Sequence, residues 1–163
     1  MDGAAMPAAA IAGAAGAAAT YLRMAAADAV LARAAGAALA LAEAFCGQWL
    51  IVRETEEVVA GTRGWQRLAV VPVRSIVAPA GDLAVDITAD GIGWVRGAGA
   101  VTVRYSAGVA ATWEALPAPV AQGVVLLAAH LFEHREGGAS PPAAVAALWR
   151  PYRRMRLSPE VRT

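Results

Sequence analysis

Two segments near the start of the chain have the apolar pattern of helices. Residues 8–22 follow Pro7, which suits a first helical turn, and contain no helix breaker except two glycines. In residues 24–47 an apolar stripe recurs at intervals of seven residues, as in a helix that packs in a bundle. The residues of this stripe are Met24, Leu31, Ala38 and Phe45. Gly47 is placed to end the second helix.

Between about residues 50 and 106 the pattern changes to short β-branched runs separated by glycines and prolines. Such runs predict strands joined by turns, so we expect an inserted small antiparallel β-sheet. The candidate strands are residues 51–59, 68–71, 75–78, 83–88, 92–96 and 100–105. Strict alternation in the last run predicts that Val101, Val103 and Tyr105 share one face of the sheet. Thr102 and Arg104 then share the other face.

The remaining third of the chain returns to a helical pattern. Pro117 and Pro119 open a helix over about residues 117–135 whose apolar arc is wide enough to be buried on more than one side. Glycines and prolines then break the chain, and residues 142–152 predict a fourth helix. The expected fold is α+β, mainly a bundle of about four helices with the inserted sheet. It forms a single domain over residues 1–163, with residues 153–163 as a basic arm.

The composition adds limits to this picture. At 163 residues the chain has room for one ordinary domain, and 44 of its residues are alanine. Since each methyl group buries little area, Ala-rich surfaces are expected to close against something besides their own domain. A net charge of +1 argues against a protein that grips nucleic acid over its whole surface. The lone Cys46 predicts a small buried side chain, and the Ala- and Gly-rich residues 3–22 predict a soluble helix with no membrane role.

One motif has the spacing of a catalytic metal site. His130 and His134 flank Glu133 as in the inverted zinc-protease motif, where two histidines one turn apart bind zinc. A catalytic zinc needs a third protein ligand, and downstream only Glu136, too close, and Glu160, at the chain end, are acidic. We therefore expect a structural role for the two histidines, with no catalytic residue, no metal and no cofactor. The acidic run Glu54, Glu56 and Glu57 similarly predicts a solvated strand edge.

Two surface hypotheses remain. Small residues on the second helix predict a subunit interface, and its candidate residues are Ala34, Ala38 and Ala42. The basic end of the chain interleaves arginine with aromatic residues, which suits either phosphate binding or docking on a partner protein. We favour the protein partner. The candidate residues are Trp149, Tyr152, Arg153, Arg154 and Arg156.

A series of short motifs, taken in order, resembles the head–tail connector (adaptor) proteins of long-tailed phages and of phage-derived gene transfer agents. The motifs are Glu43-x-x-x-Gly47-x-x-Leu50, Trp65-x-x-Leu68, Pro72-Val73-x-Ser75-Ile76, Val101-x-Val103-x-Tyr105-Ser106-Ala107-Gly108, Leu116-Pro117, Ala129-His130-Leu131-Phe132-Glu133-His134-Arg135-Glu136 and Ala147-Leu148-x-x-Pro151-Tyr152-Arg153. The first helix is richer in alanine and less charged than is usual in that family, and Gln48 stands where many members have a basic residue.

The resemblance implies a structural virion protein. It implies a homo-oligomeric ring of about twelve copies that joins the portal of the DNA-filled capsid to the tail. The expected partners are the portal protein, on which the C-terminal arm would dock, and a tail-side stopper or tail terminator protein. DNA would pass through the channel without sequence-specific binding. The protein would assemble in the bacterial cytoplasm and become part of the particle neck. The alternative functions are a small nucleic-acid-binding protein that uses the Arg-rich end of the chain and, less favoured, a zinc hydrolase that uses His130 and His134.

Overall fold

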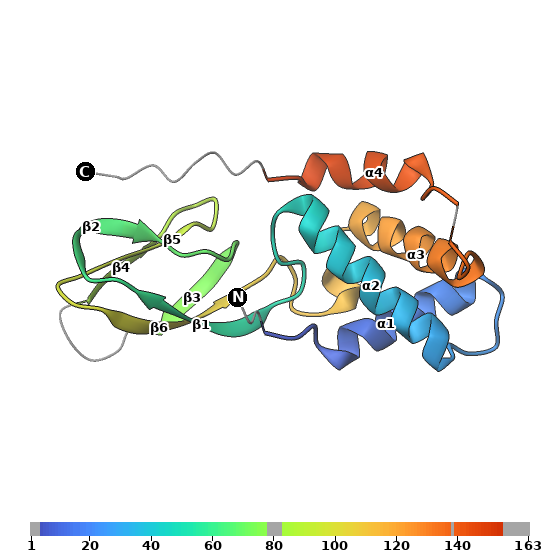
Figure 1. Cartoon of the computed structure of the whole chain (residues 1–163), viewed down its shortest axis with the longest axis horizontal. Helices are drawn as coiled ribbons and strands as arrows, with labels where there is room; N and C mark the ends of the chain where they lie inside the picture. The colour runs from blue at the N-terminus through green and yellow to red at the C-terminus, as the bar shows by residue number, and fades with distance from the viewer. Residues whose placement is uncertain (1–3, 78–82, 138, 155–163) are drawn as a thin grey trace.

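The helices and strands gather at opposite ends of the molecule (Figure 1). A computed structural model describes residues 4–77, 83–137 and 139–154. The helices are α1 (Ala8–Tyr21), α2 (Ala29–Cys46), α3 (Ala118–Glu133) and α4 (Ala143–Trp149), with two short 3₁₀ turns, η1 (Trp113–Ala115) and η2 (Arg150–Tyr152). The β insertion lies in the chain between α2 and η1. The α+β fold expected from the sequence is confirmed.

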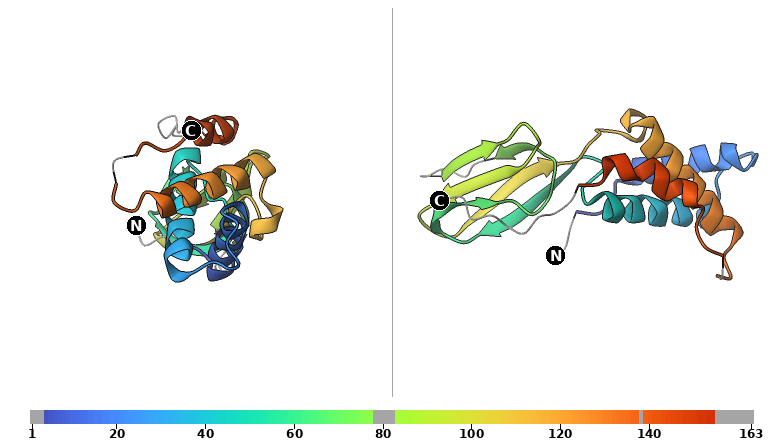
Figure 2. Two further views of the ribbon diagram at one scale, coloured as in Figure 1. Left: turned by 90° about the vertical axis from the view of Figure 1, so that its right-hand side faces the viewer. Right: turned by 90° about the horizontal axis from the view of Figure 1, so that it is seen from above.

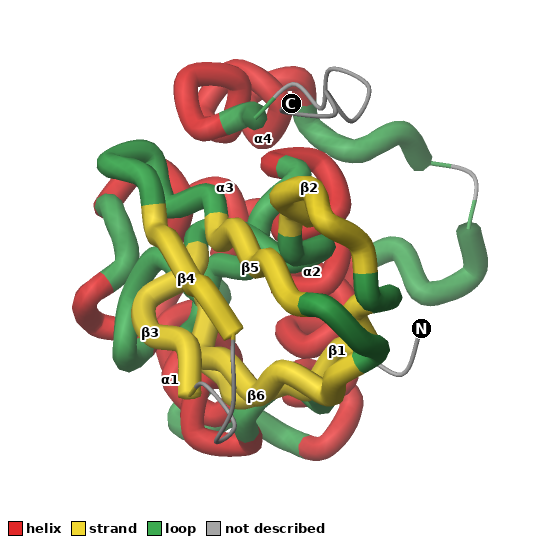
Figure 3. The backbone as a smooth tube through the Cα atoms, turned by 90° about the vertical axis from the view of Figure 1, so that its left-hand side faces the viewer, coloured by secondary structure: helices red, strands yellow, loops and turns green. Residues whose placement is uncertain are grey.

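The insertion contains two three-stranded antiparallel sheets where a single sheet was expected. Its strands are β1 (Arg53–Val59), β2 (Thr62–Arg67), β3 (Val73–Val77), β4 (Leu83–Ile87), β5 (Gly93–Gly97) and β6 (Val101–Ala107). Their orders are β1-β6-β3 and β2-β5-β4. The six strands surround a common centre (Figure 3), which is filled by a separate apolar cluster. That cluster consists of Val59, Leu68, Val73, Val95, Val103, Tyr105 and Ala107.

Strand β6 has the facing that its alternation predicts. Val103 and Tyr105 are buried in the insertion, whereas Thr102 and Arg104 are exposed on the outer face. β6 pairs with β1 without a register shift, from Arg53 opposite Ala107 to the far end of both strands. This regular central strand is therefore the part of the insertion that sequence pattern describes best.

The prediction of a strand at residues 68–71 is wrong. The chain instead forms β2 at residues 62–67, and the fully buried Leu68 follows it, its amide donating to the carbonyl oxygen of Gly93 at 2.9 Å. Leu68 thus fills the interior of the insertion as the chain leaves the strand. β2 has no clear apolar alternation, and its pairing with β5 is what makes it a strand.

Helix α2 begins at Ala29, five residues later than expected. The side chain of Asp28 accepts a hydrogen bond from the Leu31 amide at 2.8 Å and caps the helix. The expected end holds, because Gly47 adopts the left-handed conformation with φ of 67°. The length and mean hydropathy of α2, 1.6, would suit a membrane span, but it packs here against α1 and α3 as a bundle helix.

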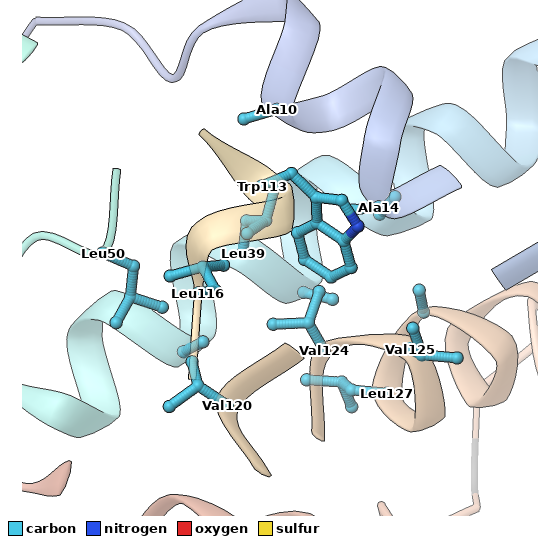
Figure 4. Packing of buried hydrophobic residues seen from close by; sticks show 14 of the residues in the cluster. Ala10, Ala14, Leu39, Leu50, Trp113, Leu116, Val120, Val124, Val125 and Leu127 are labelled. Atoms are coloured by element: carbon cyan, nitrogen blue, oxygen red, sulfur yellow. The ribbon is translucent and has the colours of Figure 1, made fainter. Parts of the chain in front are cut away.

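The helical core forms around α3, which contacts α1, α2 and α4. Trp113 of η1 inserts its ring between α1 and α3, close to Ala14 and Val124 (Figure 4). At Gly13 of α1 a β-carbon would lie 2.7 Å from Cδ1 of Trp113, so glycine is what lets the indole approach this helix. Small residues on α1 thus serve close packing within the chain.

Candidate functional site

The two histidines stack on each other at the end of α3. Their ring centroids are 4.4 Å apart, and Nδ1 of His134 lies 3.0 Å from the His130 carbonyl oxygen. Nε2 of His130 lies 3.2 Å from the carbonyl oxygen of Ala139. Among the described residues no group of three His, Cys, Asp or Glu side chains is placed to hold a metal ion. Each imidazole ring is therefore hydrogen-bonded to a nearby backbone carbonyl oxygen.

Replacing both histidines with glutamine is expected to change little. Glutamine can keep a hydrogen bond to these carbonyl oxygens, and neither histidine is in the core. The thermal midpoint and the zinc content of the purified full chain measure the effect. Equal midpoints and sub-stoichiometric zinc in both proteins are expected. A stoichiometric metal that is lost in the His130→Gln, His134→Gln variant, together with a large drop in midpoint, would contradict the structural role.

Trp149, a candidate for portal docking, is a core residue. Its side chain is 3% exposed, and its Nε1 donates to the carbonyl oxygen of Val120 at 3.1 Å. The indole covers Gly123 of α3 and lies 5.8 Å, centroid to centroid, from the ring of Phe45 on α2. The assignment of Trp149 to an outward docking arm is therefore wrong, because this side chain holds α4 onto the bundle.

The residues after Trp149 lie along the end of α2. The carbonyl oxygen of Tyr152 accepts from Nε2 of Gln48 at 2.9 Å, and the amide of Arg154 donates to the carbonyl oxygen of Cys46 at 2.8 Å. Arg153 is exposed, with its guanidinium 5.8 Å from the Phe45 ring centroid. Arg156 lies outside the described residues. Within the described chain, the exposed cationic side chains after Trp149 are therefore those of Arg150 and Arg153.

Two of the three candidate interface alanines are buried inside the chain itself. Ala38 and Ala42 are each 0% exposed and belong to the helical core, so they cannot contact a second subunit. Ala34 is partly exposed. This correction has a simple cause: alanine occurs on every face of α2, so its positions do not indicate which face is inside.

An apolar groove lies between α2 and α4, and we call it the α2–α4 groove. Its cavity volume is about 420 Å³. The lining residues are Leu41, Ala44, Phe45, Leu127, Pro141, Pro142, Ala143, Val145, Ala146 and Trp149. Leu41 at its wall is 50% exposed, and only 33% of α2 is buried. An apolar surface of this kind on a helix is typical of a contact site.

A buried ion pair connects the bundle to the β insertion. Glu43 of α2 accepts from Nη2 of Arg53 at 2.9 Å and from the amide of Leu50 at 2.8 Å. The guanidinium of Arg53 also stacks 3.9 Å from the Trp49 ring centroid. The two side chains of the pair are 6% and 13% exposed. One carboxylate therefore fixes both the exit from α2 and the start of β1.

The lone thiol of Cys46 ends α2 close to this pair. Cys46 is fully buried, as expected from the sequence. Burial, with a smaller contribution from the charge of Glu43, raises the pKa of its thiol to about 11. A thiol with a pKa this high is almost entirely protonated at neutral pH and is a poor nucleophile.

The acidic run on β1 divides between solvent and structure. Glu54 and Glu56 are exposed, and Glu56 pairs with Arg104 across the sheet. Glu57 instead accepts from the Tyr105 hydroxyl and from the amide of Ala69, each at 3.0 Å. Burial first, and then the charge of Glu57, raises the pKa of Tyr105. The solvated-edge interpretation therefore fits the first two residues, whereas Glu57 holds the loop after β2.

Comparisons with known proteins identify structural relatives of the whole chain. No protein-family model and no curated protein matches it. A chain in the neck of an empty gene transfer agent (GTA) particle with C6 symmetry is 25% identical, with a TM-score of 0.75 over 97% of this chain and 96% of that one. A chain in the neck of the native particle with C12 symmetry is 26% identical, with the same TM-score and coverage. A third, in the native GTA virion, is 27% identical, with a TM-score of 0.66 and 94% coverage of both chains.

These similarities cover both the bundle and the β insertion, so they concern the whole architecture and not a common helical motif. They agree with the resemblance that the order of the sequence motifs indicated. The protein has the fold of chains found in the neck of a gene transfer agent particle, which is consistent with a head–tail connector protein of a phage-derived particle.

Proposed function

We propose that this protein is a subunit of an adaptor ring that joins the portal of a DNA-filled capsid to the tail. The observation that carries the proposal is the similarity of 97% of the chain to a protein in a particle neck with C12 symmetry. A ring of about twelve copies would follow the same symmetry. The apolar helix α2, only 33% of which is buried, supports an assembled state, since a lone subunit would leave its exposed surface in water.

The role is structural and includes no catalytic step. The partners in this proposal are the portal protein on the capsid side and a stopper or tail terminator protein on the tail side. DNA passes through the ring without sequence-specific binding, which fits a net charge of only +1. Subunits would be made in the bacterial cytoplasm and become part of the neck when packaging ends.

We place portal docking at the end of the chain, now without Trp149. The exposed Arg153 and the neighbouring Arg154 precede a segment that includes Arg156. Arginine can pair through two parallel hydrogen bonds with a carboxylate, so an acidic portal surface would suit this segment. The contacts of Tyr152 and Arg154 with the end of α2 support this assignment, because they give the segment a fixed starting point on the bundle.

Deleting residues 155–163 and changing Arg153 and Arg154 to Ala tests this arm while leaving every described core residue in place. The truncated chain is expected to keep its thermal midpoint but to fail to join DNA-filled heads. Electron microscopy of particles made with it should then show heads without tails. The matched control is the full-length chain with Arg135→Ala, which removes an exposed arginine just after the end of α3 and should give complete particles.

Three outcomes separate the proposals. Normal recruitment of the truncated chain to portals would contradict the arm but not the ring. Complete particles made without the chain would contradict the adaptor function. Steeply salt-dependent DNA binding by the purified full chain, lost on truncation, would favour the nucleic-acid-binding alternative, because each neutralised phosphate adds about 0.9 to the salt slope.

A further inference from the structure

The lining of the α2–α4 groove is almost entirely apolar. Its ten lining residues carry one polar side-chain atom, Nε1 of Trp149, which already donates to the carbonyl oxygen of Val120. No charged side chain lines the groove, so neither phosphate nor carboxylate would be held there. Its walls come from three helices and from Pro141 and Pro142, so the shape is set by packed elements. The groove therefore suits the apolar surface of another folded protein.

An exposed aromatic side chain, Tyr21, lies across the bundle from this groove. In the described part of the bundle the large apolar residues that are exposed are Tyr21, Val30 and Leu41. Leu41 belongs to the groove, whereas Tyr21 is the last residue of α1 and is 54% exposed. α1 packs on α2 and α3, and α4 packs on the same two helices. Figures 1 and 2 show α4 and α1 on opposite sides of that pair.

A cyclic ring needs this kind of arrangement. Rotational symmetry with more than two copies repeats a head-to-tail contact, in which one surface of a subunit meets a different surface of the next. The neck structures that contain similar chains have C6 and C12 symmetry. Each copy must therefore carry two complementary surfaces that face away from each other.

We propose that the α2–α4 groove of one copy receives the Tyr21 edge of α1 from the next copy of this chain. The inference rests on the proposed ring and adds which surfaces of the subunit meet. An aromatic side chain is the type that most often anchors an interface by filling a pocket. Contact at the groove would cover Leu41 and the exposed side of α2, and contact at Tyr21 would cover the end of α1.

The two most exposed large apolar residues of the β insertion fit this contact less well. Val58 and Val77 are 72% and 60% exposed on the outer face of the β1-β6-β3 sheet, at the other end of the molecule from α1 and α4. On that face they stand beside the Glu56–Arg104 pair, so their surroundings are charged. Position 77 therefore provides a matched exposed site for a control.

Site-specific cross-linking in assembled particles tests the contact. The full chain carries Cys46→Ala together with Leu41→Cys and Tyr21→Cys, and it replaces the natural copy in the producing cells. Purified particles are treated with a short bis-maleimide and separated on a denaturing gel. We expect a ladder of covalent dimers and higher multimers, with a cross-linked peptide joining positions 41 and 21. A bridge within one copy would leave a monomer, so the ladder reports contacts between copies.

The control chain carries Cys46→Ala, Leu41→Cys and Val77→Cys, and it is expected to give monomers only. Particles that contain the first chain but yield no ladder would overturn the proposed contact while leaving the adaptor function intact. A ladder of equal yield from the control would overturn it as well. If the chain is absent from complete particles, the adaptor function fails instead. The variant Leu41→Arg adds a second measure: its thermal midpoint should stay unchanged, while its incorporation into particles should fall at least tenfold.

Discussion

The substitution Glu43→Gln is expected to be among the most destabilising single changes in the chain. It keeps the shape of the side chain and an acceptor for the Leu50 amide, but it leaves the charge of Arg53 buried without its partner. Removing one member of a buried ion pair costs about 3–5 kcal/mol of unfolding free energy. For a domain of this size that corresponds to a fall of roughly 6–20 °C in the thermal midpoint.

The matched control is Glu56→Gln. Glu56 also pairs with an arginine, but the side chains of that pair are 51% and 61% exposed. Because water solvates both partners when the pair is broken, its loss should leave the midpoint nearly unchanged. Urea denaturation of the two variants decides the comparison. If Glu43→Gln lowers the free energy of unfolding no more than Glu56→Gln does, the buried pair does not stabilise the junction between the bundle and the β insertion.

A double-mutant cycle isolates the interaction itself. Arg53→Met removes the cation and should lower the free energy of unfolding of the natural chain, because it leaves the largely buried Glu43 carboxylate with only the Leu50 amide. In the Glu43→Gln background, Arg53→Met should lower the free energy of unfolding by less, since it leaves no unpaired carboxylate at position 43. Additive costs would mean that the two residues act independently.

Sequence pattern could predict the elements whose two faces have different residues. β6 alternates valine and tyrosine with threonine and arginine, so its buried face was clear. The wide apolar arc of α3 likewise indicated a helix buried on several sides, which is what its contacts with three other helices show. In both elements the burial of large apolar side chains contributes most of the favourable folding free energy. The spacing of those side chains along the sequence therefore indicates which face is buried.

The same reasoning could not orient the Ala-rich helices. Ala38 is in the core and Ala44 lines the groove, although both are methyl side chains on one helix. Leu39 is fully buried, whereas Leu41, two residues later, is half exposed. A few large side chains in a run of alanine do not fix the rotation of a helix. The faces of α2 are set by its neighbours, above all α3 and α1, which sequence pattern alone does not place.

Trp149 shows a second limit of composition. Tryptophan beside arginine is common at interfaces, but a tryptophan whose indole N–H is hydrogen-bonded is also common in protein cores. The deciding residue is Gly123, 26 positions earlier in the chain, which leaves the space that the indole fills. That complementarity could not be predicted from either residue alone.

The substitution Trp149→Ala is expected to loosen α4 from the bundle. It empties a site enclosed by α2 and α3 and leaves the carbonyl oxygen of Val120 without its donor. Truncation of a buried tryptophan costs about 3–5 kcal/mol, and the α2–α4 groove would lose one wall in the process. Urea denaturation measures the cost, and hydrogen exchange of the α4 amides shows whether the loss is local. A variant as stable as the natural chain would show that Trp149 does not hold α4.

A pair of glycine substitutions tests the same contact from the other side. At Gly123 a β-carbon would lie 2.8 Å from Cδ1 of Trp149, so Gly123→Ala should displace the indole and destabilise the chain by about 1–3 kcal/mol. At Gly16, on the exposed side of α1, nothing lies within 4 Å of the added carbon. Gly16→Ala should therefore stabilise the chain by up to about 1 kcal/mol, because alanine favours helix. In the Trp149→Ala background, Gly123→Ala should lose its cost, since the clashing ring is gone. If the cost of Gly123→Ala persists there, the close approach of Trp149 is not its cause, and α4 must be held by other contacts.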